Sequence, residues 1–135
     1  QVTMGQPEIN SGIASITGPW IMKEILGMSR TIELTLTGRM MPAQECREIG
    51  LIHHLVPREQ VLPKALEIAG QLAAKAPLAM RLEHAWFADT TEAGFRETID
   101  AATRPHRDSY AAGEPARKME SFMAARGHAL EGAKR

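Results

Sequence analysis

Two short strand-like segments stand in a chain that is otherwise patterned for helices. Residues 1–5 have the character of a strand end, and residues 51–56 are short, largely apolar and followed by Pro57. A strand needs partner strands for its main-chain N–H and C=O groups, and the 135 residues offer no obvious sheet. We therefore expect a mostly α-helical chain with two short strands, whose remaining sheet lies in sequence upstream.

Prolines and glycines mark the expected helices of the first half. An irregular loop over residues 6–17 precedes a helix that starts at Gly18-Pro19 and stops at Gly27. Ser29 is expected to cap the next short helix, which runs to Gly38. Pro42 then opens a further turn or two of helix, residues 43–49.

Apolar residues recur at helical spacing through the second half. They predict helices over residues 61–73, 78–87, 91–102 and 116–125. Thr91 is expected to cap the third of these, and Pro105 to end or kink it.

Composition excludes several classes of partner. Sixteen basic and sixteen acidic residues cancel, so we expect neither nucleic acid nor an anionic membrane as a partner. No run of about 18 apolar residues predicts a membrane span. The single cysteine, Cys46, excludes an internal disulfide and favours a reducing, cytoplasmic location. His53 and His54 would point to opposite faces of a strand, one into the core and one outward, so we expect no metal site.

The segment Gly5-Gln6-Pro7-Glu8-Ile9-Asn10-Ser11-Gly12-Ile13 has the character of an active-site turn. Glu8 follows a proline and stands among apolar residues. Burial there would disfavour the charged carboxylate, so that the group could carry a proton in either direction. The alternative is a loop glutamate that caps a nearby turn. Gly12 suits a positive φ angle or close approach of a ligand, although a plain turn explains it equally well.

Several weak motifs in a fixed order resemble the crotonase superfamily, the enoyl-CoA hydratases and isomerases. They extend over roughly residues 4–126: Gln6-Pro7-Glu8 with Gly12, Leu36-Thr37-Gly38-Arg39, Ala43-Gln44-Glu45-Cys46-Arg47-Glu48-Ile49-Gly50-Leu51-Ile52, Leu55-Val56-Pro57, and the helix–Pro–helix junction Leu72-Ala73-Ala74-Lys75-Ala76-Pro77-Leu78-Ala79.

The resemblance implies the C-terminal portion of a crotonase-like α/β (ββα-spiral) fold, with the upstream spiral core largely absent. Residues 1–57 would then be the end of the spiral core, with the active-site loop, short helices and last strand. Residues 58–130 would be a C-terminal helical (oligomerisation) domain, and residues 131–135 a disordered tail.

The same resemblance implies a role for named residues. Glu8 would be catalytic, transferring a proton to the α-carbon of an acyl-CoA thioester through an oxyanion-stabilised enolate. The implied substrate contacts are Pro7, Gly12, Ile13, Trp20 and Phe122. Coenzyme A would enter as part of the substrate, and no further cofactor is expected. Both oxyanion amides and the second catalytic group would lie upstream, so this chain alone would be inactive.

Alternatives remain open at this point. The parent could be a hydratase, the commonest member, or an isomerase, thioester hydrolase or decarboxylase. The chain could instead be a catalytically inert helical association fragment. The implied partners are an acyl-CoA, further copies in a trimer or dimer of trimers, and an N-terminal half of the same protein. Trp20, Ile21 and Met22 could line an acyl pocket, although core packing of that helix is the simpler interpretation.

Two departures from the family pattern concern substrate contacts. The loop after Glu8 lacks the usual P-G-x-G-G stretch and carries the bulky Trp20. After Phe122 and Arg126 the chain offers His128 and Leu130 where the family often has an aromatic residue. A basic cluster in the last third is either a solvated helix face or a contact for CoA phosphates: Arg104, His106, Arg107, Arg117, Lys118 and Arg126.

Overall fold

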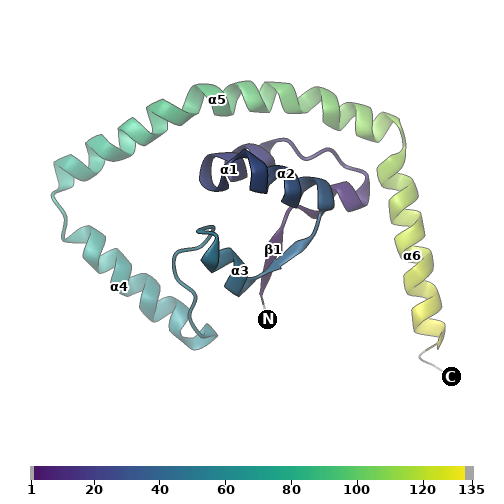
Figure 1. Cartoon of the computed structure of the whole chain (residues 1–135), viewed down its shortest axis with the longest axis horizontal. Coiled ribbons are helices and arrows are strands. Elements are labelled where there is room, and N and C mark those ends of the chain that lie inside the picture. The colour runs from purple at the N-terminus through teal and green to yellow at the C-terminus, as the bar shows by residue number, and fades with distance from the viewer. Residues whose placement is uncertain (1, 133–135) are drawn as a thin grey trace.

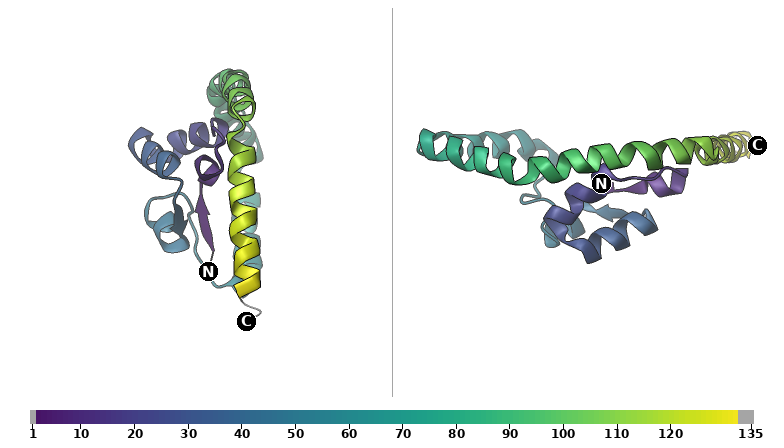
Figure 2. Two further views of the ribbon diagram at one scale, coloured as in Figure 1. Left: turned by 90° about the vertical axis from the view of Figure 1, so that its right-hand side faces the viewer. Right: turned by 90° about the horizontal axis from the view of Figure 1, so that it is seen from above.

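A small central unit of two strands and short helices lies under an arch of three longer helices (Figure 1). In this computed structural model, residues 2–132 are described, with the main chain alone for residues 127–132. The three arch helices lie close to one plane, and the central unit sits on one side of it (Figure 2). The chain is thus mostly helical, as expected, with one small sheet.

The sheet consists of β1, Thr3–Gly5, and β2, Met40–Pro42. The strands are antiparallel, with Met4 opposite Met41. The strand expected over residues 51–56 is wrong. The N–H groups of Leu51 and Ile52 both donate to the carbonyl of Cys46, at 2.9 and 3.2 Å, and so close the end of the preceding helix instead of pairing with a strand.

Three short α-helices and a 3-10 turn complete the central unit. They are η1, Pro7–Ser11, within the segment expected to be irregular, α1, Thr17–Leu26, α2, Met28–Thr37, and α3, Ala43–Glu48. Gly27 occupies the N-cap of α2 without a side-chain cap, so the capping role expected of Ser29 is wrong. The core is formed by Met22, Leu34, Met41 and Cys46.

The longest helix is α5, Pro77–Ala111, where two helices were expected. Thr91 is not a cap. Its hydroxyl and that of Thr90 donate to the carbonyl of Phe87, at 2.8 and 3.0 Å, as threonines do inside a helix. Pro105 stands inside the helix without ending it. The proline has no N–H for the carbonyl four residues earlier, and α5 curves over the central unit (Figure 1).

Two further helices flank α5, one before it and one after it in the chain. A 3-10 turn, η2, Arg58–Gln60, leads into α4, Val61–Ala73, and Gly113 separates α5 from α6, Glu114–Gly132. The last helix is therefore longer than the predicted residues 116–125. It includes residues 131 and 132 of the expected disordered tail, and residues 133–135 lie outside the described part of the chain.

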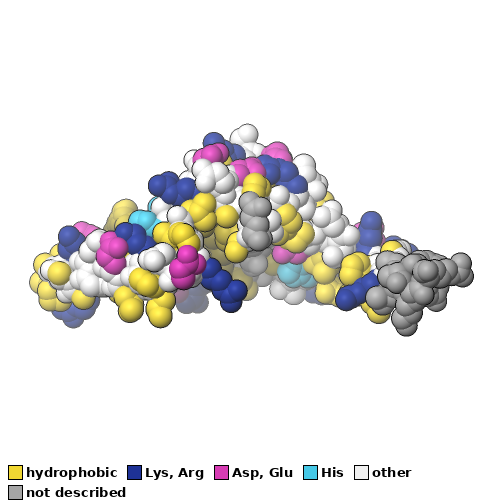
Figure 3. All heavy atoms as spheres, turned by 90° about the horizontal axis from the view of Figure 1, so that it is seen from below, with side chains coloured by type: hydrophobic (Ala, Val, Ile, Leu, Met, Phe, Trp, Pro, Cys, Tyr) yellow, Lys and Arg dark blue, Asp and Glu magenta, His cyan; other side chains and the backbone are white. Residues whose placement is uncertain are grey.

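The arch leaves many large apolar side chains exposed. Figure 3 shows hydrophobic side chains spread over the underside of the molecule. On α4 and the first half of α5, Leu62, Leu66, Leu82, Trp86 and Phe87 are each at least 60% exposed. In the part of the chain that the structure describes, no helix combines the length and apolar character that a membrane crossing requires.

Candidate active site

Glu8 lies in the first turn of η1, directly after Pro7. Its side chain is partly buried, and its Oε2 atom is buried without a hydrogen-bond partner among the described residues. A buried carboxylate oxygen is normally hydrogen-bonded, since burial without a partner is costly. Among the described residues this oxygen therefore caps no turn, and it is available to a group that they do not provide.

Asn10 holds the turn of Glu8 against the end of α2. Its side-chain Nδ2 donates to the main-chain carbonyl of Gly38 at 2.9 Å. Gly38 has φ of 59°, and a Cβ atom there would lie 2.7 Å from Asn10 Nδ2 and from Ile9 Cγ2. Only glycine combines this backbone conformation with so close a contact.

Gln6 holds the other side of the same turn. Its Oε1 accepts a hydrogen bond of 3.2 Å from the Ser15 hydroxyl. The Gln6 side chain also packs on Gly18, where a Cβ would lie 2.2 Å from Oε1. Glu8 therefore stands between two side-chain anchors, one two residues before it and one two residues after it.

The loop after Glu8 rests on the corner between α5 and α6. The N–H of Ala14 donates to the hydroxyl of Ser109 at 3.3 Å, and that hydroxyl donates to the carbonyl of Pro105 at 2.9 Å. Gly12 has φ of 70°, and a Cβ there would lie 2.8 Å from Cβ of Glu114. Gly12 therefore adopts a positive φ angle and also lets α6 approach the loop closely, so the close contact is with the same chain rather than with a ligand.

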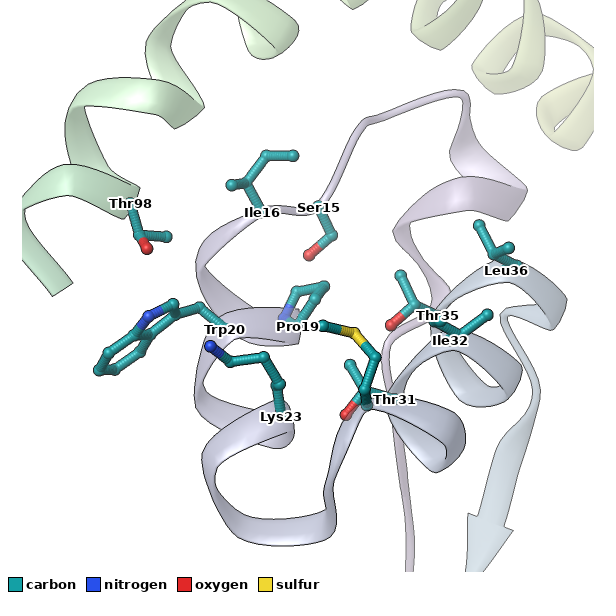
Figure 4. Close-up of a pocket in the computed structure, with 11 residues that line it drawn as sticks. Ser15, Ile16, Pro19, Trp20, Lys23, Thr31, Ile32, Thr35, Leu36 and Thr98 are labelled. Atoms are coloured by element: carbon teal, nitrogen blue, oxygen red, sulfur yellow. The ribbon is translucent and has the colours of Figure 1, made fainter. Parts of the chain in front are cut away.

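Trp20 lines a groove between α1 and α2, which we call the α1–α2 groove (Figure 4). Its volume is about 340 Å³. The Trp20 ring packs on Phe95 of α5 with ring centroids 5.4 Å apart, while Met22 on the same helix is buried in the core. Core packing therefore holds for Met22, whereas the acyl-pocket interpretation of Trp20 stays a prediction. The lining residues are Ser15, Ile16, Pro19, Trp20, Lys23, Met28, Thr31, Ile32, Thr35, Leu36 and Thr98.

Ile13 and Phe122 meet in a second groove, which we call the α6 groove. It has a volume of about 720 Å³ and lies between η1 with its following loop and the α5–α6 corner. Tyr110 and Lys118 line it as well, so one residue of the predicted basic cluster faces a cavity. The structure thus brings Ile13 and Phe122 together and puts Trp20 in the other groove. Pro7, Glu8 and Gly12 line neither groove.

The other reactive side chains form no second centre in the described part of the chain. Cys46 is fully buried, with Sγ 3.9 Å from the carbonyl oxygen of Met41. His53 and His54 are both exposed, so the expected inward-facing histidine is wrong, because the strand on which that expectation rested does not form. Among the described residues, no three histidine, cysteine or carboxylate side chains gather closely enough to hold a metal ion.

The family model of enoyl-CoA hydratase/isomerase matches residues 1–128. The chain belongs to the enoyl-CoA hydratase/isomerase family. The resemblance to the crotonase superfamily is thereby confirmed. Crotonyl-CoA hydratase of Syntrophomonas wolfei is 31% identical to this family member over 107 residues, which are 78% of this chain and 40% of the relative. Enoyl-CoA hydratase EchA19 of Mycobacterium tuberculosis is 51% identical over 49 residues, 36% of this chain and 18% of the relative.

Solved structures of the family share the fold. An enoyl-CoA hydratase/isomerase from Pseudoalteromonas atlantica superposes with a TM-score of 0.83 at 17% identity, over 92% of this chain and 50% of that one. A carnitinyl-CoA hydratase from Mycobacterium avium superposes with a TM-score of 0.78 at 24% identity, over 91% and 49%. These likenesses confirm the crotonase-like fold class. This family member spans about half the length of the solved structures that it matches.

Gln6 and Asn10 lie in the turn that the sequence indicates, but their anchoring roles, and any role of Ser109 or Thr35, were not predicted. Gln6, Asn10 and Ser109 anchor the turn and loop, and Thr35 has a buried hydroxyl oxygen without a partner among the described residues. The Ala14–Ser109 contact joins residues 95 positions apart, so no local pattern could have revealed it.

Proposed function

We propose that this chain contributes the proton-transferring carboxylate, Glu8, to an enzyme that acts on acyl-CoA thioesters through an oxyanion-stabilised enolate. The observation that carries the proposal is the buried Oε2 of Glu8, which has no partner among the described residues. The anchors at Gln6 and Asn10 add support, because a general acid or base works only when its geometry is held.

In this proposal Glu8 delivers a proton to the α-carbon while water adds at the β-carbon of an enoyl thioester. Negative charge develops on the thioester oxygen and requires two N–H donors placed around it. We assign these donors and the second catalytic group to sequence outside this chain. Among the possible activities of the parent we favour hydratase, the commonest in the family. Isomerase, thioester hydrolase and decarboxylase activities use related enolate or oxyanion chemistry and differ mainly in that second group.

The two grooves are proposed as substrate contacts. The α1–α2 groove, with Trp20, is apolar enough for an acyl chain. The α6 groove pairs the apolar Ile13 and Phe122 with the cationic Lys118, a combination that suits the pantetheine and phosphate parts of coenzyme A. Several relatives are named as hydratases of CoA thioesters, among them crotonyl-CoA hydratase and mevalonyl-CoA hydratase, which supports this substrate class. No further cofactor is proposed.

The second candidate is an association role for the helical part of the chain. The exposed apolar side chains of α4 and α5 favour it, because apolar patches of this extent mark interaction surfaces. We propose a trimer or a dimer of trimers, and packing against an upstream half of the same protein. Analytical ultracentrifugation tests this candidate. A stable, compact monomer at micromolar concentration would contradict it.

The catalytic proposal is tested by assaying two preparations with crotonyl-CoA. One is the protein purified from its source, with its length read from the intact mass, and the other is the 135-residue chain alone. We expect turnover only where the upstream half is present, since each oxyanion donor contributes about 10²–10³ in rate. Robust hydration by the isolated chain would overturn the assignment of the donors to another part of the protein.

A further inference from the structure

One hydroxyl in the α1–α2 groove differs from the other partly or fully buried hydroxyls in helix interiors. Thr31, Thr98 and Ser109 each donate to the carbonyl four residues earlier, at 2.9, 2.8 and 2.9 Å. Thr35 also stands inside a helix and its Oγ1 is buried, yet this atom has no hydrogen-bond partner among the described residues. A buried hydroxyl left without a partner is destabilising, so this atom points to a partner outside the described residues.

The other polar groups around the groove already have partners. The Ser15 hydroxyl donates to Gln6, Lys23 pairs with Glu24 at 2.8 Å, and the hydroxyls of Thr31 and Thr98 bond their own helices. Thr35 is therefore the one hydroxyl in the described lining without a hydrogen bond. The rest of the lining is apolar: Ile16, Pro19, Trp20, Met28, Ile32 and Leu36.

The position of Thr35 connects the groove to the turn of Glu8. Thr35 is three residues before Gly38, whose carbonyl accepts the hydrogen bond from Asn10. Figure 4 shows the Thr35 hydroxyl directed into the groove from α2, opposite Pro19 of α1. A volume of about 340 Å³ falls within the range of small-molecule sites. Apolar walls with one hydrogen-bonding group suit an aliphatic chain with one polar substituent.

We propose that Thr35 is a specificity-determining residue and that the α1–α2 groove takes an acyl chain carrying a hydroxyl or keto oxygen. This inference rests on the proposed function, because that function supplies the acyl-CoA. A threonine hydroxyl can donate to a keto oxygen and either donate to or accept from a hydroxyl. A site built to hydrogen-bond a substrate oxygen discriminates against the analogue that lacks it, because its own polar group is then left unpaired. Met28, 57% exposed at the groove, has the flexibility to move aside for such a chain.

The binding test compares hexanoyl-CoA with its 4-, 5- and 6-hydroxy derivatives in the full-length protein by calorimetry. These probes have no double bond to hydrate, so binding is measured without turnover. We expect at least one hydroxylated probe to bind about five- to tenfold more tightly than hexanoyl-CoA. Thr35→Val should abolish the difference, and Thr35→Ser should retain it.

The outcomes separate this inference from the proposed function. If hexanoyl-CoA binds but neither the wild-type protein nor Thr35→Val distinguishes any hydroxylated probe, the role of Thr35 is overturned and the acyl-CoA proposal stands. If none of the four probes binds, the acyl-CoA proposal fails and this inference fails with it.

A stability measurement tests the premise separately. Thr35→Val removes a hydroxyl that has no partner in the described structure, so the melting temperature should stay the same or rise. Thr31→Val, one turn earlier on α2, removes a hydroxyl bonded to Gly27 and should lower the melting temperature by about 2–4 °C. Equal destabilisation by both substitutions would show that the Thr35 hydroxyl is paired in solution, which would overturn the inference.

Discussion

The side chain of Asn10 donates a 2.9 Å hydrogen bond to the carbonyl of Gly38, a residue 28 positions away in sequence. This contact joins the turn that carries Glu8 to the C-terminus of α2. The junction has no space for an added Cβ at Gly38, so both residues are needed for the turn to occupy its place.

Asn10→Leu should therefore destabilise the chain by about 1 kcal/mol, because it removes the donor from a partly buried carbonyl. Urea denaturation measures the change. Gln44→Leu is the control, because that amide also makes a 2.9 Å hydrogen bond, but to Glu48 on an exposed helix surface. We expect less than about 0.5 kcal/mol for the control. Equal effects would contradict the anchoring role of Asn10.

Gly38→Ala should destabilise more than Gly50→Ala. Both glycines have a positive φ angle, 59° and 83°, so both substitutions carry backbone strain of about 1–2 kcal/mol. At Gly50 the added Cβ would meet no described atom within 4 Å apart from its chain neighbours, whereas at Gly38 it would meet Asn10 and Ile9 at 2.7 Å. The excess at Gly38 should be about 1–3 kcal/mol, the usual range for overpacking. Equal losses in denaturation would mean that the turn of Glu8 does not rest on Gly38.

Arg39 should make the stability of the chain depend on pH in the acid range. It bonds Glu33 at 2.7 Å and Glu45 at 2.6 Å, and so ties α2 to α3. The hydrogen bond from Arg39 lowers the pKa of Glu45 below its ordinary value. Because the folded pKa lies below the unfolded one, the stabilisation is present above the unfolded pKa and is lost as pH falls through the folded pKa.

Arg39→Met should accordingly lower the melting temperature at neutral pH and reduce its fall between about pH 5 and about pH 3. Both partners are partly exposed, so the effect is small and weakens in salt. Arg96→Met is the control, because its pair with Glu92 lies within one exposed helix face. A parallel pH profile for wild type and Arg39→Met would contradict the role of the pair.

Local signals predicted the ends of the short helices α1 and α2 better than the ends of the long helices or the strands. Gly27 and Gly38 end helices as expected, because each supplies a positive φ angle that other residues adopt only at a cost. The segment after Gly50 has strand-like composition, but its first N–H groups are taken by the carbonyl of Cys46. Thr91 resembles a cap in sequence and bonds within a continuous helix instead. Whether a segment becomes a strand or a helix end, and whether a threonine caps a helix, depends on which hydrogen-bond partner the folded chain brings to it.

In the candidate site, too, local sequence identified some residues, whereas the contacts between distant residues could not be predicted. Pro7-Glu8 and Gly12 were identifiable from residue type and order. The anchoring contacts of Asn10 and Ser109 were not, since they join residues 28 and 95 positions apart. That the Thr35 hydroxyl lacks a partner among the described residues could not be predicted either, because three comparable hydroxyls bond their own helices.

The central claim is that Glu8 moves the α-proton of an acyl-CoA. Its most direct test is the exchange of α-protons of butyryl-CoA in D₂O, followed by mass spectrometry, with the full-length protein and its Glu8→Gln variant. Exchange requires only removal and return of the α-proton, so it reports on Glu8 whichever overall reaction the parent catalyses. Glu83→Gln, at an exposed position on α5 that lines neither groove, is the matched control.

We predict that Glu8→Gln slows exchange by at least about 10²-fold, the lower range for a placed proton-transfer group. The dissociation constant for butyryl-CoA should stay within a few-fold of wild type, because the amide keeps the size of the side chain. If the Glu8→Gln variant exchanged α-protons at the wild-type rate and only its melting temperature fell, the account would be contradicted and Glu8 would be a structural residue of the turn.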